Sequence, residues 1–131
     1  MDNREIVVRF FIEGYTNKNY EFIMQCVSED YYDHSPAGAR SNADAVGILK
    51  IVAGQFSDLK VTVLDAFADG DMVATRVLYE GVHTGECMGV APTGKKITFE
   101  ALENFKVQSG RIVESWGYWP DKEIEEKLTR G

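Results

Sequence analysis

The chain has 131 residues, of which 44% are hydrophobic and 27% are charged, and its formal net charge is −7 at pH 7. A chain of this size and composition forms one domain, residues 1–131, with its own hydrophobic core. The negative charge argues against nucleic acid as a partner, because nucleic-acid binding depends on basic patches, and it disfavours strongly anionic substrates unless a local basic pocket overrides it.

The first half of the chain predicts three helices, at residues 3–16, 20–28 and 42–56. Asp2 with Glu5 three residues later is a capping box, and Asn19 and Ser41 are suitable caps for the second and third helices. Apolar residues at helical spacing follow each cap. Tyr15 ends the apolar stripe of the first helix, where its hydroxyl is either satisfied within the core or donates a hydrogen bond into a pocket.

A short strand is predicted at Tyr31–Pro36, because a residue that precedes proline is pushed out of the helical region. The segment contains Asp33 and His34, which could act as a base and its partner. Neighbouring residues of a strand point to opposite faces, so these two side chains are not expected to contact each other. A structural polar role is therefore expected for at least one of them.

Residues 59–67 and 72–83 alternate between apolar and polar side chains, which predicts two strands joined by a tight turn. The glycine-rich segment 84–94 has no lysine-bearing phosphate-loop pattern, so no nucleotide or other cofactor is predicted. Residues 95–119 alternate again, as a second hairpin, and a short helix is expected after Pro120.

Glu103 interrupts an otherwise apolar row of the second hairpin. The row on its face consists of Ile97, Phe99, Ala101, Glu103, Phe105 and Val107. A charge in such a row is rare unless it is paired or functional. Glu103 is therefore the leading candidate for a functional side chain.

The turn of this hairpin decides which residue faces Glu103. A three-residue loop closed by a glycine bulge at Gly110 pairs Glu103 with Ser115. A two-residue loop instead sets Glu103 against Trp116. We favour the bulged loop, which surrounds the carboxylate with small groups and predicts a polar notch in an apolar sheet face.

Helices segregated from a mostly antiparallel sheet predict the α+β class, with a curved sheet wrapped over the three helices and a cavity into which Glu103 points. The outer row of the second hairpin is too apolar to face water, and it consists of Leu102, Ile112, Trp116 and Tyr118. We expect a second copy of the chain to cover this row, in a homodimer.

Cys26 and Cys87 are isolated and form no CxxC pair, which indicates a reduced, cytoplasmic protein. No apolar run approaches the ~20 residues of a membrane span, and the N-terminus lacks the apolar core of a signal peptide, so no membrane partner is expected. His34 and His83 are the only histidines and lie far apart, so no metal site is predicted.

Four short motifs are spread along the chain: YYDHSP at 31–36, FSDL at 56–59, GVHTGECMGVAPTGKK at 81–96 and GRIVESW at 110–116. Together they resemble the SnoaL-like polyketide cyclase family of the nuclear transport factor 2-like superfamily. The HTGxxMGxxPTGK part is the most specific. The resemblance covers nearly the whole chain and implies a cone-shaped α+β barrel of the cystatin-like type, a deep apolar pocket, frequent dimers and no metal.

The resemblance also implies proton transfer, because enzymes of this family close a ring in a polyketide ester by acid–base catalysis. They usually have an acidic residue directly after the tryptophan of the last motif, where this chain has Gly117. The polar position that the family places across from it, on the preceding strand, falls at Glu103. Either the carboxylate has moved to the facing strand, or the activity is lost.

Two functions follow. In the first, the protein is a proton-transfer enzyme for a small apolar, cyclic or polyketide-like molecule, with Glu103 as acid and base and with Tyr15 or His34 donating to a developing enolate oxygen. The residues expected to line its pocket are Phe11, Phe56, Thr75, Phe99, Ala101, Ser115, Gly117 and Trp119. In the second, it is a non-catalytic ligand-binding or dimeric interaction module, because a fold does not fix a function.

Overall fold

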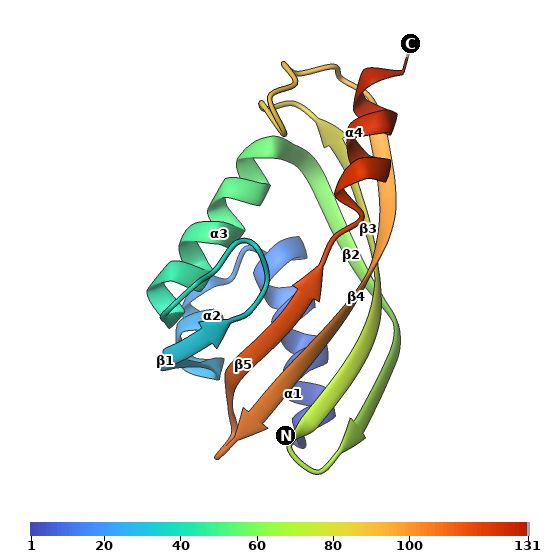
Figure 1. The fold of residues 1–131 in the computed structure, drawn as a ribbon. Coiled ribbons are helices and arrows are strands. Elements are labelled where there is room, and N and C mark those ends of the chain that lie inside the picture. The colour runs from blue at the N-terminus through green and yellow to red at the C-terminus, as the bar shows by residue number, and fades with distance from the viewer. Residues whose placement is uncertain (131) are drawn as a thin grey trace.

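The computed structural model describes residues 1–130 and shows an α+β fold (Figure 1). Its helices are α1 (Asn3–Phe11), α2 (Tyr20–Cys26), α3 (Asn42–Gln55) and α4 (Asp121–Thr129), and a π-helical turn, η1 (Ile12–Thr16), continues α1. Its strands are β1 (Val27–Asp33), β2 (Phe56–Asp69), β3 (Met72–His83), β4 (Lys96–Gln108) and β5 (Arg111–Tyr118). Among these described residues, no helix combines the length and the apolar character that crossing a membrane requires.

The three N-terminal helices begin where the predicted caps are. Asp2 Oδ1 accepts a hydrogen bond from the Glu5 backbone N–H at 2.8 Å, and Asn19 and Ser41 cap α2 and α3 in the same way. The second helix ends two residues earlier than predicted, because the backbone becomes extended at Val27, where β1 begins.

The strands form one curved, open sheet in the order β1-β5-β4-β3-β2. Neighbouring strands are antiparallel, except that β1 runs parallel to β5. Helices α1, α2 and α3 lie on the concave face of the sheet, and α4 packs against β4 at one end (Figure 1). The predicted α+β architecture is confirmed, with β1 and β2 as the free edges of an open barrel.

The β4–β5 hairpin begins with a two-residue turn and not with the predicted three-residue loop. Ser109 and Gly110 form the turn, with positive φ angles of 52° and 76°, as the commonest tight hairpin turn requires. A bulge follows in β5, because Val107 pairs with Ile112 whereas Lys106 pairs with Glu114. The bulge shifts the register of the rest of the hairpin by one residue.

The shifted register changes the partner of Glu103 but keeps its side chain on the inner face. Glu103 pairs with Gly117, so the predicted pairing with Ser115 and the alternative pairing with Trp116 are both wrong. The bulge also turns Ile112 inward, where it is completely buried. Ile112 therefore does not belong to the outer row in which the sequence placed it.

The core lies between the concave face of the sheet and helices α1 to α3. Phe10 and Phe11 of α1 pack on Phe105 of β4, with ring centroids 5.6 and 5.3 Å away. Large buried aromatic rings contribute strongly to the packing energy of a core. These contacts fix α1 against the part of β4 that carries Glu103.

Candidate functional site

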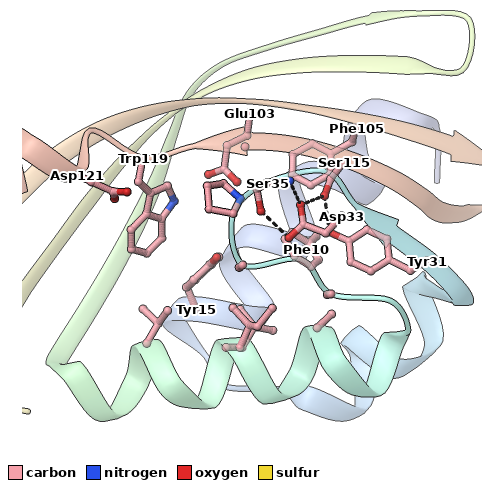
Figure 2. A pocket seen from close by; sticks show the side chains of 18 residues that line it. Phe10, Tyr15, Tyr31, Asp33, Ser35, Glu103, Phe105, Ser115, Trp119 and Asp121 are labelled. Atoms are coloured by element: carbon pink, nitrogen blue, oxygen red, sulfur yellow. Dashed lines mark hydrogen bonds between the residues drawn. The ribbon is translucent and has the colours of Figure 1, made fainter. Parts of the chain in front are cut away.

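A cavity of about 200 Å³ lies between α3 and the concave face of the sheet (Figure 2). Helix α3 provides an apolar wall made of Ala45, Ile48, Leu49 and Val52. The sheet and the loop after β1 provide the polar side, with Tyr31, Asp33, Ser35, Glu103 and Ser115. The cavity is therefore apolar toward the helix and carries carboxyl and hydroxyl groups toward the sheet.

Glu103 projects from the middle of β4 into this cavity (Figure 2). The Tyr79 hydroxyl donates a hydrogen bond to Glu103 Oε2. Burial is the main cause that raises the pKa of Glu103 to about 7; the hydrogen bond from Tyr79 opposes the rise, and the Asp33 carboxylate adds to it. Glu103 is consequently divided between its acid and carboxylate forms near neutral pH.

Gly117 makes room for the Glu103 side chain. A Cβ atom at position 117 would lie 2.6 Å from Glu103 Oε1 and 3.0 Å from Glu103 Cγ. Any side chain at this position would displace the carboxyl group. On the neighbouring strand β3, Thr75 pairs with Glu103. The Thr75 hydroxyl donates a hydrogen bond of 2.8 Å to the backbone carbonyl oxygen of Glu103. The Glu103 carboxyl is thus held in a slot above Gly117.

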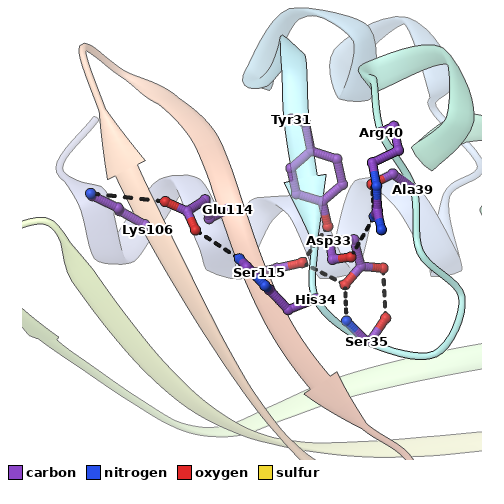
Figure 3. A network of polar contacts seen from close by, with 9 residues as sticks. All are labelled: Tyr31, Asp33, His34, Ser35, Ala39, Arg40, Lys106, Glu114 and Ser115. Carbon is purple, nitrogen blue, oxygen red and sulfur yellow. Dashed lines mark hydrogen bonds and ion pairs between the residues drawn. The ribbon is translucent and has the colours of Figure 1, made fainter.

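Asp33 is the second carboxyl group at the cavity, and several donors hold it (Figure 3). Ser35 donates from its backbone N–H to Oδ1 at 2.9 Å and from its hydroxyl to Oδ2 at 2.6 Å. The Ser115 hydroxyl donates to Oδ1 at 3.1 Å and is also hydrogen-bonded to the Tyr31 hydroxyl. Both oxygens of the Asp33 carboxyl therefore accept hydrogen bonds.

Two buried tyrosines approach Glu103 from different elements. Tyr79 of β3 is completely buried, and its ring stacks on Phe99 with the centroids 4.9 Å apart. Tyr15 of η1 lines the cavity and meets the Tyr79 ring edge-on, with the centroids 5.3 Å apart. Burial raises the pKa of Tyr15 well above its usual value, and the charge of Glu103 adds to the rise. Tyr15 therefore remains a neutral hydroxyl donor.

His34 lies outside the cavity, and the prediction that it donates into the pocket is wrong. Its Nε2 is 2.8 Å from Glu114 Oε2 on the outer side of the sheet (Figure 3). Its ring stacks on Trp116, with the centroids 4.7 Å apart. Strand alternation is the reason, because Asp33 points inward and its neighbour must then point outward.

The structure gathers part of the predicted site around the cavity, namely Tyr15, Glu103, Ser115, Gly117 and Trp119. The other predicted lining residues are buried elsewhere, and they are Phe11, Phe56, Thr75, Phe99 and Ala101. Phe10 takes the place predicted for Phe11, because α1 turns that side toward the cavity. Phe56 instead packs near His83, with ring centroids 6.0 Å apart, and Phe99 and Ala101 continue the inner row of β4 past the cavity.

The sequence indicated Asp33 as a possible base but not the donors that hold it, and three other parts of the site were not predicted: the hydroxyl of Tyr31, the hydroxyl of Tyr79 and the apolar wall of α3. Tyr31 and Asp33 occupy alternate positions of β1 and therefore share a face, which is a signal that the sequence does contain. Within residues 1–130, no group of three or more His, Cys, Asp or Glu side chains is arranged to hold a metal ion.

The fold and the cavity define an α+β protein whose cavity carries three carboxyl groups, of Asp33, Glu103 and Asp121, and several hydroxyl groups among apolar side chains. The profile of the SnoaL-like polyketide cyclase family matches residues 5–128. The chain belongs to this family.

Solved structures of other proteins share the fold. IdmH, a candidate polyketide cyclase from Streptomyces antibioticus, is 27% identical with a TM-score of 0.87, over 99% of this chain and 100% of that one. AclR, a candidate hydroxylase from Streptomyces galilaeus, is 25% identical with a TM-score of 0.84, over 96% and 80% of the two chains. A candidate SnoaL-like polyketide cyclase from Jannaschia sp. CCS1 has a TM-score of 0.89 over 98% and 92% of the chains, and at 18% identity this likeness concerns the fold alone. No curated protein sequence matches the chain significantly.

Proposed function

We propose that this protein is an acid–base enzyme that moves protons on a small cyclic or polyketide-like carbonyl compound. The observation that carries the proposal is that Glu103 and Asp33 line one cavity in different surroundings. Glu103 is desolvated and has a pKa of about 7, whereas Asp33 accepts hydrogen bonds on both of its oxygens. Two carboxyl groups that differ in this way can serve as acid and base at the same pH. Membership of the family and the likeness to IdmH support the reaction class.

Asp33 is the proposed base. It removes a proton from a carbon next to a carbonyl group, and the electrons of the broken C–H bond move to the carbonyl oxygen to give an enolate. Glu103 in its acid form and Tyr15 donate hydrogen bonds to that oxygen, which stabilises the developing charge. The enzyme predicted from the sequence used Glu103 as both acid and base, whereas here Asp33 is the base and Glu103 is the acid.

Ring closure completes the proposed reaction. The enolate carbon attacks a second carbonyl carbon of the same substrate and forms the new C–C bond, and the electrons of that carbonyl move to its oxygen. The resulting alkoxide takes the proton of Glu103, and water carries the proton held by Asp33 back to Glu103. The product is an isomer of the substrate, so no co-reactant is consumed.

Exchange of α-protons for deuterium tests the proposal on model carbonyl compounds, so the natural substrate need not be identified first. The protein is incubated in D₂O with a panel of cyclic ketones and β-keto esters, and the loss of α-proton signals is followed by NMR. Asp33→Asn should slow the exchange by at least about 100-fold, since general-base catalysis contributes this much. Glu29→Gln removes an exposed carboxylate of β1 and should leave the rate unchanged.

Two outcomes of this experiment decide between the candidate functions. If the protein accelerates exchange and Asp33→Asn abolishes the acceleration, the enzyme is supported. If compounds of the panel bind in the cavity but no exchange is accelerated, the protein is a non-catalytic ligand-binding member of the family.

We also propose that the chain forms a homodimer through the outer face of β4 and β5. Leu102 and Tyr118 are 69% and 60% exposed and pair with each other across the two strands. Phe67 of β2 is aligned with Trp116 of β5 across the sheet, through the paired residues of β3 and β4. The Phe67 side chain is 69% exposed. Large apolar side chains gathered on one sheet face favour burial against another subunit. A dimeric interaction module is therefore the second candidate function, and it does not require catalysis.

A further inference from the structure

The charged groups that line the cavity are acidic. Asp33 and Glu103 lie on its sheet side, and Asp121, at the start of α4, is exposed and therefore marks its rim (Figure 2). No Lys, Arg or His among residues 1–130 lines the cavity.

Arg40 contacts the Asp33 segment but does not line the cavity. Its Nη1 donates to the backbone carbonyl oxygens of Asp33 and Ala39, at 2.9 and 3.1 Å (Figure 3). Its guanidinium carbon lies 3.9 Å from the centroid of the Tyr32 ring, which is exposed. Arg40 is thus engaged with the backbone and with an exposed ring, and it does not offer a counter-charge to a ligand.

A negatively charged ligand in this cavity would meet like charges, and the described lining residues include no cation to compensate them. Repulsion between charges a few ångströms apart is several times stronger at a partly desolvated site than in water. The net charge of −7 adds a field of the same sign at longer range. A neutral carbonyl oxygen, in contrast, can accept hydrogen bonds from the Tyr15 hydroxyl and from the acid form of Glu103.

We infer that the cavity selects its ligand by charge: it takes neutral carbonyl compounds and rejects the same carbon skeleton when it carries a carboxylate or phosphate group. Asp121 is the specificity-determining residue at the rim, because it repels an approaching anion without belonging to the acid–base pair. The inference rests on the proposed function for the carbonyl nature of the ligand, but it does not depend on turnover.

The protonation of Glu103 is coupled to this selection. The groups that face the Glu103 carboxyl are Tyr79 from β3, Tyr15 from η1, Asp33 from β1 and the Trp119 indole after β5. Each of these groups is neutral or acidic, so an anion that does enter favours the acid form of Glu103 and binds together with a proton. A neutral ligand has no such requirement.

Methyl benzoate and benzoate form a matched pair of probes, because they share a ring and a carbonyl group and differ in charge. Binding of each is measured by NMR chemical-shift titration of the intact protein at about pH 8 and about pH 5.5, on either side of the pKa of Glu103 at about 7. Methyl benzoate is uncharged at both pH values, so at the higher pH its affinity should fall only by the loss of the hydrogen bond from the acid form of Glu103. Benzoate should bind at least about tenfold more weakly than the ester at the higher pH, and the difference should shrink at the lower pH.

Asp121→Asn should reduce the difference in affinity between the two probes. Without the Asp121 carboxylate, benzoate should bind more tightly, whereas the affinity of methyl benzoate should not change. Glu125→Gln is the control, because it removes an exposed carboxylate of the same helix that does not line the cavity. Benzoate binding as tightly as the ester at about pH 8 would overturn the inference, and so would an ester that shifts no cavity resonance up to its solubility limit. A protein that binds the ester more tightly than benzoate but does not accelerate α-proton exchange would support the charge selection and refute the proposed enzyme. Failure of the charge selection is therefore distinguishable from failure of the proposed function.

Discussion

Glu103 makes the stability of this protein depend on pH, and Glu103→Gln should remove that dependence. Burial raises the pKa of the Glu103 carboxyl from 4.5 to about 7. Between these two values the native state binds more protons than the unfolded state. The stability that this group contributes is therefore fully present below about pH 4.5 and is lost as the pH rises through about 7.

The size of the effect follows from the pKa difference, because each pH unit corresponds to about 1.36 kcal/mol. Well above pH 7, the ionised Glu103 destabilises the fold by about 3 kcal/mol. Glutamine has almost the same shape, can still accept the hydrogen bond from Tyr79, and carries no charge. Glu103→Gln should therefore be more stable than the wild type by about 2–3 kcal/mol near pH 8, and by less than about 1 kcal/mol near pH 5.

Urea unfolding of both proteins at these two pH values measures the difference. Glu29→Gln is the matched control, because Glu29 is exposed on β1 and its removal should change the stability equally at both pH values. If the difference in the free energy of unfolding between wild type and Glu103→Gln does not vary with pH, the pKa of Glu103 is not raised in the native state. A variant that is less stable than the wild type near pH 8 would also refute the reasoning, because Glu103 would then act as a stabilising ionised partner.

Three further substitutions test other parts of the structure. Gly117→Ala should destabilise the fold by about 1–3 kcal/mol through its contact with Glu103, and urea unfolding should show no such loss when the same change is made in a Glu103→Ala background. Tyr79→Phe removes the hydrogen bond that opposes the effect of burial, so the pKa of Glu103 should rise above about 7 in an NMR titration; an unchanged pKa would mean that this bond does not form. Leu102→Glu should convert a dimer into a monomer in sedimentation velocity, whereas Ile51→Glu, at an exposed site on α3, should not; a wild type that is monomeric at about 100 µM would contradict the interface.

The elements could be predicted from the sequence because their signals are local. Asp2 and Ser41 cap helices that begin directly after them, and the alternation around Glu103 placed its side chain on the correct face of the sheet. These features depend on a few neighbouring residues, so tertiary contacts do not alter them.

The register and the composition of the site could not be predicted in the same way. The two-residue turn shifts the partner of Glu103 from Ser115 to Trp116, and the bulge opposite Lys106 and Val107, which no glycine marks, shifts it by one more residue to Gly117. The donors to Asp33 come from a loop and from a strand far along the chain, and the sequence alone does not indicate that β1 pairs in parallel with β5. The prediction for His34 was wrong because neighbouring residues of a strand point to opposite faces. Asp33 points into the cavity, so His34 points away from it.

The slot above Gly117 restricts the routes by which related sequences can evolve. A chain with glutamate at position 103 favours glycine at 117, because even one added methyl group would lie 2.6 Å from the carboxyl oxygen and force the glutamate side chain to move. By the same contact, we expect a chain that carries its acid at 117 to favour a smaller side chain at 103. A lineage can change from one arrangement to the other only through an ancestor that either lacks the acid or crowds two of them together, unless both codons change at once. Positions 103 and 117 should therefore covary across the SnoaL-like family, and a relative without an acid after its tryptophan is not for that reason inactive.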